Sequence, residues 1–198
     1  MSGRFDLVVF LDCEFTCWEM SMETGWADKR YPPEIIQIGL AVFDTKRDKH
    51  IEDYASYVRP RINPRLSDYC KKLLGLTQDV VDNAKDFCAV AEEIFNLLQS
   101  YEKSSIYTCA WGNDRDVVAE NAARCDSVDP FSMLSQMDLQ QIASNIFGFQ
   151  DKLLTRESVK QKLGFAFSKD RHNALDDAMD LKNILDAIKR NKNREYIR

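Results

Sequence analysis

FDLVVFLDCEF, residues Phe5–Phe15, is the stretch on which the fold of this 198-residue chain depends. Its continuous apolar run, Leu7–Leu11, is typical of a strand that is buried on both faces. Asp12 and Glu14 follow two residues apart, so their side chains point to one face of that strand. Taken alone, such a pair more often marks an exposed strand end. If the pair is buried, cations must neutralise it, and hard divalent ions such as Mg²⁺ or Mn²⁺ prefer oxygen ligands.

The last predicted helix, from Ala174 to about Lys189, offers a third carboxylate. Apolar residues recur there at helical spacing and define one face, formed by Ala174, Ala178, Leu181, Ile184, Leu185 and Ile188. At about 100° per residue, Asp177 falls within this apolar face and Asp176 falls outside it. Because a carboxylate that points along a core stripe needs a cationic partner, Asp177 is the third candidate metal ligand.

His172 lies five residues before Asp177, just ahead of the helix. A lone histidine is usually structural, but its position beside an inward-facing aspartate favours a catalytic role. Imidazole titrates near neutral pH and suits a general base that activates water. The only other histidine, His50, lies in a charged turn and is interpreted as a solvated surface residue.

A fourth acid is expected in WGNDRD, residues Trp111–Asp116. If a helix begins here, its inner side is formed by Val117, Val118, Ala122 and Cys125. Asp114 lies in the middle of that side, whereas Asp116 points nearly opposite. We therefore choose Asp114 as the fourth ligand, with Asp116 as the alternate. Either residue is also compatible with a simple helix N-cap.

The remaining pattern predicts strands and helices that alternate along a single domain. Further strands are expected at Glu34–Phe43, Ile51–Val58 and Ser105–Trp111. Helices are expected at Ser67–Leu74, Thr77–Ala84, Phe87–Tyr101, from Gly112 to about Arg124, Leu139–Phe147 and Arg156–Leu163. Ser21–Pro33 reads as a loop, and Gly148 and Gly164 as helix ends. This order predicts an α/β fold, a mixed sheet flanked by helices, over residues 1–188, followed by a basic tail, 189–198.

Composition narrows the class of protein. With 44% hydrophobic and 30% charged residues, the chain is expected to be globular, and it has no apolar run of the roughly 20 residues that span a bilayer. We expect an intracellular, cytoplasmic location without membrane association. The six cysteines show no C-x-x-C pairing, which favours reduced, mostly buried thiols over disulfides or a zinc site. A net charge of −5 argues against coating nucleic acid by bulk charge, but it leaves open an enzyme whose bound cations receive an anionic substrate.

Several of these segments together resemble a known enzyme family. FLDCEFTCWE (Phe10–Glu19), PPEIIQIG (Pro32–Gly39) and HNALDDAMDLKNIL (His172–Leu185) look like motifs of DEDDh exonucleases, in the DnaQ-like superfamily. YVRPRINPRLSDYCKKLLGLTQDVVDNA (Tyr57–Ala84) is more narrowly similar to the branch of histone-mRNA 3′-end, enhanced-RNAi and sporulation kinase-inhibitor exonucleases. The resemblance extends over nearly the whole chain, from about Leu7 to Ala187.

The resemblance implies a ribonuclease-H-like fold and 3′→5′ polarity. It also implies roles for the singled-out residues: metal ligands at Asp12, Glu14, Asp114 and Asp177, and a general base at His172. One departure concerns the fourth acid. Relatives commonly place two residues between the Trp-Gly pair and the aspartate, whereas only Asn113 separates Gly112 from Asp114 here. An ungapped match would place Arg115 at the acid.

The expected reaction is hydrolysis of the 3′-terminal phosphodiester of a single-stranded nucleic acid with two Mg²⁺ ions, releasing nucleoside 5′-monophosphates. The similarity at Tyr57–Ala84 favours RNA over DNA. Phe15 and Trp111 flank the acids and are candidates to stack on the terminal base, with core packing as the alternative. Two other hypotheses remain: a DNA proofreading or repair exonuclease of the same superfamily, and a module that binds RNA ends without cutting them.

Overall fold

The computed structural model describes residues 7–102, 106–147, 154–165 and 172–195, the last five by their backbone only. Six strands form one sheet in the order β4-β3-β2-β1-β5-β6. The strands are β1 (Leu7–Phe15), β2 (Ile35–Asp44), β3 (Lys49–Arg59), β4 (Lys85–Asp86), β5 (Ile106–Ala110) and β6 (Ser135–Asp138). The sheet is mixed, because β1–β2 and β2–β3 are antiparallel whereas β1–β5, β5–β6 and β3–β4 are parallel. The predicted α/β fold with a mixed sheet in a single domain is confirmed.

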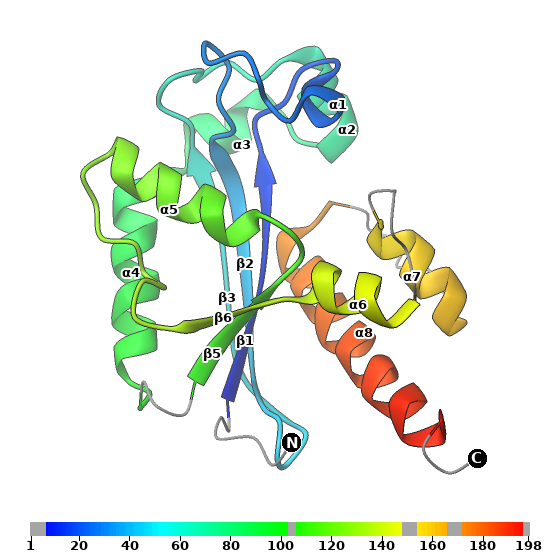
Figure 1. Cartoon of the computed structure of the whole chain (residues 1–198). Helices are drawn as coiled ribbons and strands as arrows, with labels where there is room; N and C mark the ends of the chain where they lie inside the picture. The colour runs from blue at the N-terminus through cyan, green and yellow to red at the C-terminus, as the bar shows by residue number, and fades with distance from the viewer. Residues whose placement is uncertain (1–6, 103–105, 148–153, 166–171, 196–198) are drawn as a thin grey trace.

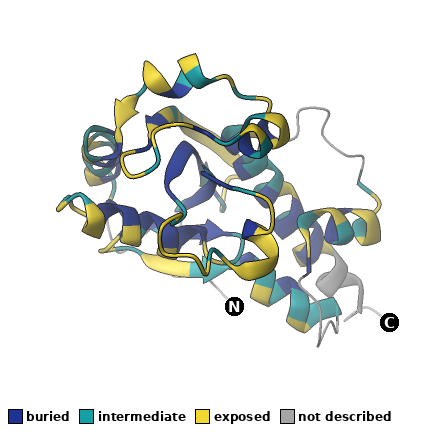
Figure 2. Cartoon of the chain, turned by 90° about the horizontal axis from the view of Figure 1, so that it is seen from above, coloured by how far each residue is buried: buried dark blue, intermediate teal, exposed yellow. Residues whose placement is uncertain are grey.

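Helices cover both faces of the sheet and one of its ends (Figure 1). They are α1 (Ser21–Thr24), α2 (Asp68–Leu74), α3 (Gln78–Asp82), α4 (Phe87–Gln99), α5 (Asp114–Arg124), α6 (Leu139–Phe147), α7 (Arg156–Leu163) and α8 (Ala174–Glu195). α4 and α5 share one hydrophobic core with the sheet, and α6, α7 and α8 share the other. Figure 2 shows the buried residues concentrated in the sheet and on the sides of the helices that face it.

β1 lies at the centre of the sheet, as its apolar sequence predicts. Val9 and Leu11 point toward the core shared with α4 and α5, whereas Val8 and Phe10 point toward the core shared with α8. Because side chains alternate along a strand, Asp12 continues the α8 side. The pairing of β1 with β2 keeps one register from Leu7 to Glu14 and shifts only before Phe15, so Asp12 and Glu14 both lie on the side of the last helix.

A glycine on β2 sets how closely α8 approaches the sheet. Gly39 lies opposite Asp12, and a Cβ built on it would be 2.3 Å from the backbone of Ala174 and Leu175. Ala174 also donates its N–H to Oε1 of Gln37 at 3.3 Å. The first turn of α8 therefore rests directly on the backbone of β2, beside the end of β1.

Most predicted elements match, and the differences are local. α8 runs to Glu195, beyond the predicted end at Lys189, so most of the expected basic tail is helical, and residues 196–198 lie outside the described part. The predicted loop Ser21–Pro33 contains the single-turn helix α1. β4 and β6 were not predicted, because two and four largely polar residues carry no strand pattern. Gly164 ends α7 with a φ of 74°, as predicted, whereas Gly148 lies outside the described residues.

The composition of the sequence led to two further expectations, one about the state of the cysteines and one about membrane-spanning segments. All six cysteines are free, in agreement with the absence of paired spacing in the sequence. Within the described ranges, every helix is too short or too polar to cross a membrane.

Candidate active site

Three carboxylates meet where β1 ends and α8 begins. Ligand oxygens of Asp12, Glu14 and Asp177 all lie within 4.8 Å of one another. Asp12 is 2% exposed, Glu14 is 8% exposed, and the Asp177 side chain is 13% exposed. The strand pattern correctly placed Asp12 and Glu14 on one face, and the helix pattern correctly predicted that Asp177 points inward.

Asp114, at the start of α5, is the fourth buried acid of the site. Its charge raises the pKa of Asp12, which places the two carboxylates within electrostatic reach of each other. Asp116 is exposed. Arg115 turns elsewhere, with Nη2 2.8 Å from Oδ2 of Asp129 and its guanidinium over the ring of Phe131. Asp114 is thus buried and electrostatically coupled to the three close carboxylates, whereas Asp116 is exposed, and the choice of Asp114 as the fourth ligand stays a prediction.

The position of the cluster follows from the sheet. β1 and β5 are parallel, and their pairing stops at Leu11 and Ala110. Asp12 lies directly after the paired part of β1, and Asp114 begins the helix that follows β5. The carboxyl ends of parallel strands are where open α/β sheets commonly bind ligands. Two segments about a hundred residues apart thus deliver their acids to one edge.

Burial dominates the electrostatics of these acids. Together with the neighbouring carboxylates, and against the opposing charge of Arg156, burial raises the pKa of Asp12 well above its usual range and that of Asp114 to about 7. Burial likewise raises the pKa of Asp177. Oδ2 of Asp12 is buried without a hydrogen-bond partner among the described residues. The possible ligands are all oxygens, their negative charges outnumber the positive ones, and one acceptor is unused. These properties fit a hard divalent cation.

One cation does reach the acids, and the sequence analysis did not identify it. Nη1 of Arg156, the first residue of α7, lies 2.5 Å from Oδ1 of Asp12, and Nη2 lies 3.4 Å from Oδ2 of Asp177. A signal was present in the sequence. Arg156, Val159 and Leu163 recur at helical spacing, so the arginine shares the inward side of α7, as Asp177 shares that of α8.

His172 lies at the rim of the cluster. Its Nδ1 is 3.6 Å from Oε1 of Glu14, and its side chain is one-third exposed. The contact with Glu14 raises the pKa of the imidazole, although burial opposes this. The residue has a φ of 67°, a left-handed conformation that histidine adopts more readily than most residues. His50 is exposed and pairs with Asp53 on β3, which confirms its interpretation as a surface residue.

The two aromatic candidates adjoin the site in sequence, Phe15 at the end of β1 and Trp111 directly after β5, and both are partly exposed. Phe15 meets Trp26 edge to face at 6.1 Å between ring centroids and packs against the core under α4 and α5. Trp111 packs against the core under α8. Core packing is thus part of the role of each ring, and the exposed part of each leaves base stacking open.

A buried glutamate that the sequence analysis did not single out orders the loop beside the site. The carboxylate of Glu34 accepts hydrogen bonds at 2.7 Å from the backbone N–H groups of Arg61, Ile62 and Asn63. Thr16 donates its N–H to the Glu34 carbonyl at 2.8 Å. These bonds hold the start of the segment 60–84 against the end of β1.

Comparisons with known proteins agree with this geometry. Residues 9–185 match the RNase T family model, described as "Exonuclease". The chain is 41% identical over 98 residues to "3'-5' exonuclease eri1" of Schizosaccharomyces pombe, a match that covers 50% of this chain but only 30% of the yeast protein. It is 31% identical over 189 residues to "Probable 3'-5' exonuclease KapD" of Bacillus subtilis, covering 93% of this chain and 85% of that one.

A solved structure, "3'-end specific recognition of histone mRNA stem-loop by 3'-exonuclease", superimposes with a TM-score of 0.82. The match covers 97% of this chain and 84% of the other, at 22% sequence identity. At that identity the likeness concerns the fold, which is the ribonuclease-H-like arrangement expected from the motifs.

Proposed function

Because the chain belongs to the RNase T exonuclease family, we propose that it is a metal-dependent 3′→5′ exonuclease that acts on single-stranded nucleic acid. The observation that carries the proposal is the convergence of buried carboxylates from β1, α5 and α8 beside a partly exposed histidine. A module that only binds nucleic-acid ends has no need of this costly arrangement. The proposed product of each cycle is a nucleoside 5′-monophosphate.

Asp12, Glu14, Asp114 and Asp177 are the residues that would hold the metal. Mg²⁺ is the proposed ion, in two copies, with Mn²⁺ as a substitute. When bound, the ions would lower the pKa of the attacking water and stabilise the leaving 3′ oxygen. The protein itself supplies fixed oxygen ligands and buried surroundings, which strengthen every charge interaction with the scissile phosphate.

His172 is the proposed general base. If Nδ1–H donates to Glu14, the ring is oriented and Nε2 keeps the lone pair that accepts a proton from water. The partial exposure of the side chain gives the proton a route to solvent. Phe15 and Trp111 are proposed to stack on the terminal base through the parts of their rings that remain exposed.

We propose RNA as the preferred substrate. The support is a sequence similarity over 91% of this chain to "3'-5' exoribonuclease 1" of Homo sapiens, and a shared fold with a 3'-exonuclease studied on a histone mRNA stem-loop. Because the match covers only 51% of the human protein, substrate choice there can depend on parts that have no counterpart in this match. The same chemistry would serve a DNA exonuclease, so substrate preference is measured separately.

The test is digestion of matched RNA and DNA oligonucleotides, labelled at the 5′ end and either free or blocked at the 3′ end. We expect Mg²⁺-dependent shortening of the free 3′ ends, faster on RNA, and none in EDTA. Asp12→Asn and His172→Ala should each reduce the rate by on the order of 10²-fold or more. Unchanged Mg²⁺-dependent degradation by both variants would contradict the proposed site, and faster digestion of DNA would reverse the substrate preference.

A further inference from the structure

Arg156 is the basic side chain that, among the described residues, enters the acidic cluster most deeply. It bridges two elements, β1 through Asp12 and α8 through Asp177. Burial acts to lower its pKa, but the charges of the four acids raise it, so the guanidinium stays protonated. A single positive charge therefore sits among four carboxylates that come from three different elements.

Two of the residues that are expected to bind metal are contacted by Arg156. Its nitrogens lie against Oδ1 of Asp12 and Oδ2 of Asp177, and these two residues belong to the three whose oxygens lie within 4.8 Å of one another. A divalent ion on these oxygens would face the guanidinium at short range, and like charges repel strongly where water is excluded. The arginine and the ion therefore compete for the same positions.

We propose that Arg156 is a positioning residue of the metal site, whose guanidinium takes a cation position on Asp12 and Asp177 until a divalent ion displaces it. The inference rests on the proposed function, since it assumes that these acids bind metal. In the metal-free protein the arginine keeps the acids together. Because a metal ion has to displace it, the arginine raises the metal concentration that is needed to fill the site.

The guanidinium can leave without disturbing α7. The helix is anchored independently, by Val159 in the core, by the ion pair of Lys160 with Asp180, and by the N-cap Thr155, whose Oγ1 accepts the N–H of Ser158 at 3.2 Å. The Arg156 side chain is 20% exposed, so solvent already reaches it. Rotation about the side-chain bonds of Arg156 is then enough for the exchange.

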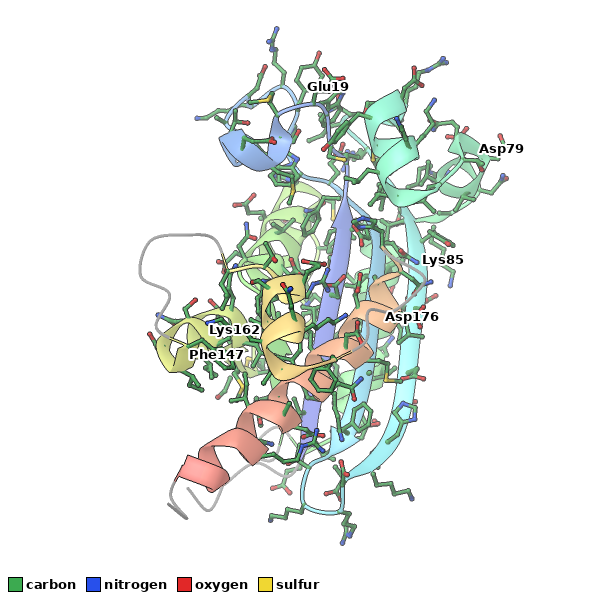
Figure 3. The ribbon with its side chains drawn as sticks, turned by 90° about the vertical axis from the view of Figure 1, so that its right-hand side faces the viewer. Glu19, Asp79, Lys85, Phe147, Lys162 and Asp176 are labelled. Atoms are coloured by element: carbon green, nitrogen blue, oxygen red, sulfur yellow. The ribbon has the colours of Figure 1, made fainter. Side chains whose placement is uncertain are left out.

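The experiment compares the wild-type protein with Arg156→Met and a control, Lys162→Met, after removal of metal with EDTA. Lys162 lies on the same helix, but its ammonium faces the ring of Phe147 on α6 at 5.7 Å (Figure 3). Mn²⁺ binding is measured by calorimetry at about pH 7.5 for all three proteins, and thermal unfolding is recorded with and without Mn²⁺.

We expect Arg156→Met to bind Mn²⁺ about tenfold more tightly, because the competing charge is gone. Without metal it should unfold at a lower temperature than the wild-type protein, and Mn²⁺ should raise that temperature by more. Lys162→Met should match the wild-type protein in Mn²⁺ affinity. A merely structural arginine would give the opposite sign, since its loss would loosen the site and weaken Mn²⁺ binding.

If Arg156→Met binds Mn²⁺ no more tightly than the wild-type protein does, the proposed exchange between the guanidinium and the metal ion is wrong. If this variant does not fold without metal, Arg156→Lys provides the same test, because a shorter ammonium cannot bridge both acids and affinity should rise by less. A double variant, Asp12→Asn with Arg156→Met, removes one charge of each sign and should regain the metal-free unfolding temperature without tight Mn²⁺ binding. If neither the wild-type protein nor Arg156→Met binds Mn²⁺, the proposed metal site itself is wrong.

Discussion

The two faces of β1 begin alike and end differently. On the side of α4 and α5 the strand remains apolar, with Val9 and Leu11 in the core. On the side of α8, Val8 and Phe10 are apolar, and the next residue on that face is Asp12. Burial stabilises the folded chain on the first face, whereas on the second it costs stability until cations neutralise the acids. The acids that β1 contributes to the proposed site are therefore confined to the end of one face, whereas the other face contributes only to the core.

The largest expected effect comes from neutralising an acid on the α8 side. Asp177→Asn should lower the nuclease rate by on the order of 10³-fold, because a proposed metal ligand loses its charge. In the metal-free protein the same change should raise the unfolding temperature, since one buried carboxylate fewer is left to repel Asp12 and Glu14. Loss of activity with gain of stability distinguishes an acidic site from a core position, where substitution lowers both.

Asp176 provides a matched control, because it is adjacent in sequence and exposed. Asp176→Asn should leave both the rate and the unfolding temperature nearly unchanged. An equal loss of activity in the two variants would mean that α8 presents a different side to β1 than the one described.

The second prediction concerns the contact that joins the acidic side to the last helix. In Gly39→Ala the new Cβ would lie 2.3 Å from backbone atoms of Ala174 and Leu175, and backbone cannot rotate away as a side chain can. We expect a loss of about 3 kcal/mol in the free energy of unfolding, together with weaker metal binding as α8 moves away from β1. Urea denaturation and Mn²⁺ calorimetry measure the two effects.

Gly25→Ala is the control for backbone strain without a clash. Gly25 has a φ of 59°, but a Cβ added there would meet nothing within 4 Å beyond its chain neighbours. The expected cost is about 1 kcal/mol, with unchanged metal binding. Equal effects on metal binding at the two glycines would show that the close approach at Gly39 does not control the site.

Much of the fold, and the side of its element on which each acid lies, could be predicted from periodicity, whereas the role of these acids as metal ligands was implied by the family resemblance. The apolar run of β1 and the stripe along α8 oriented Asp12, Glu14 and Asp177, and the inner side of α5 separated Asp114 from Asp116. These predictions depend on which way a side chain points within its own element, and the local pattern of the sequence contains that information.

The features that were missed depend on how distant elements pack. Arg156 lies 144 residues from Asp12 in sequence, and no local pattern states which carboxylate a helix will meet. Glu34 was included in a predicted strand, although its role is to bind the backbone of a loop 27 to 29 residues away. Such polar contacts follow from tertiary geometry, which has to be known before they can be assigned.

The smallest expected effect is the response of the metal-free protein to pH. Burial raises the pKa of Asp114 to about 7 and also raises those of Asp12 and Asp177, while the contact with Glu14 raises that of His172. With its pKa raised on folding, each group binds protons more tightly in the folded state, so its contribution is complete at low pH and is lost as pH rises through the folded pKa. The free energy of unfolding should thus increase by about 2 kcal/mol from about pH 7.5 to about pH 5.5.

The predicted pH dependence of stability can be tested further with a variant, with Mg²⁺ and at lower pH. Asp114→Asn should remove most of the increase, and saturating Mg²⁺ should reverse it, because metal binds the deprotonated acids. Below about pH 4 the sign should change, since the backbone N–H of Arg47 lowers the pKa of Asp44, and protonation of such acids destabilises the fold. If the free energy of unfolding of the metal-free protein stays constant or falls between about pH 7.5 and about pH 5.5, the acids at the end of β1 are not buried together. The distinction between the two faces of the strand would then be lost.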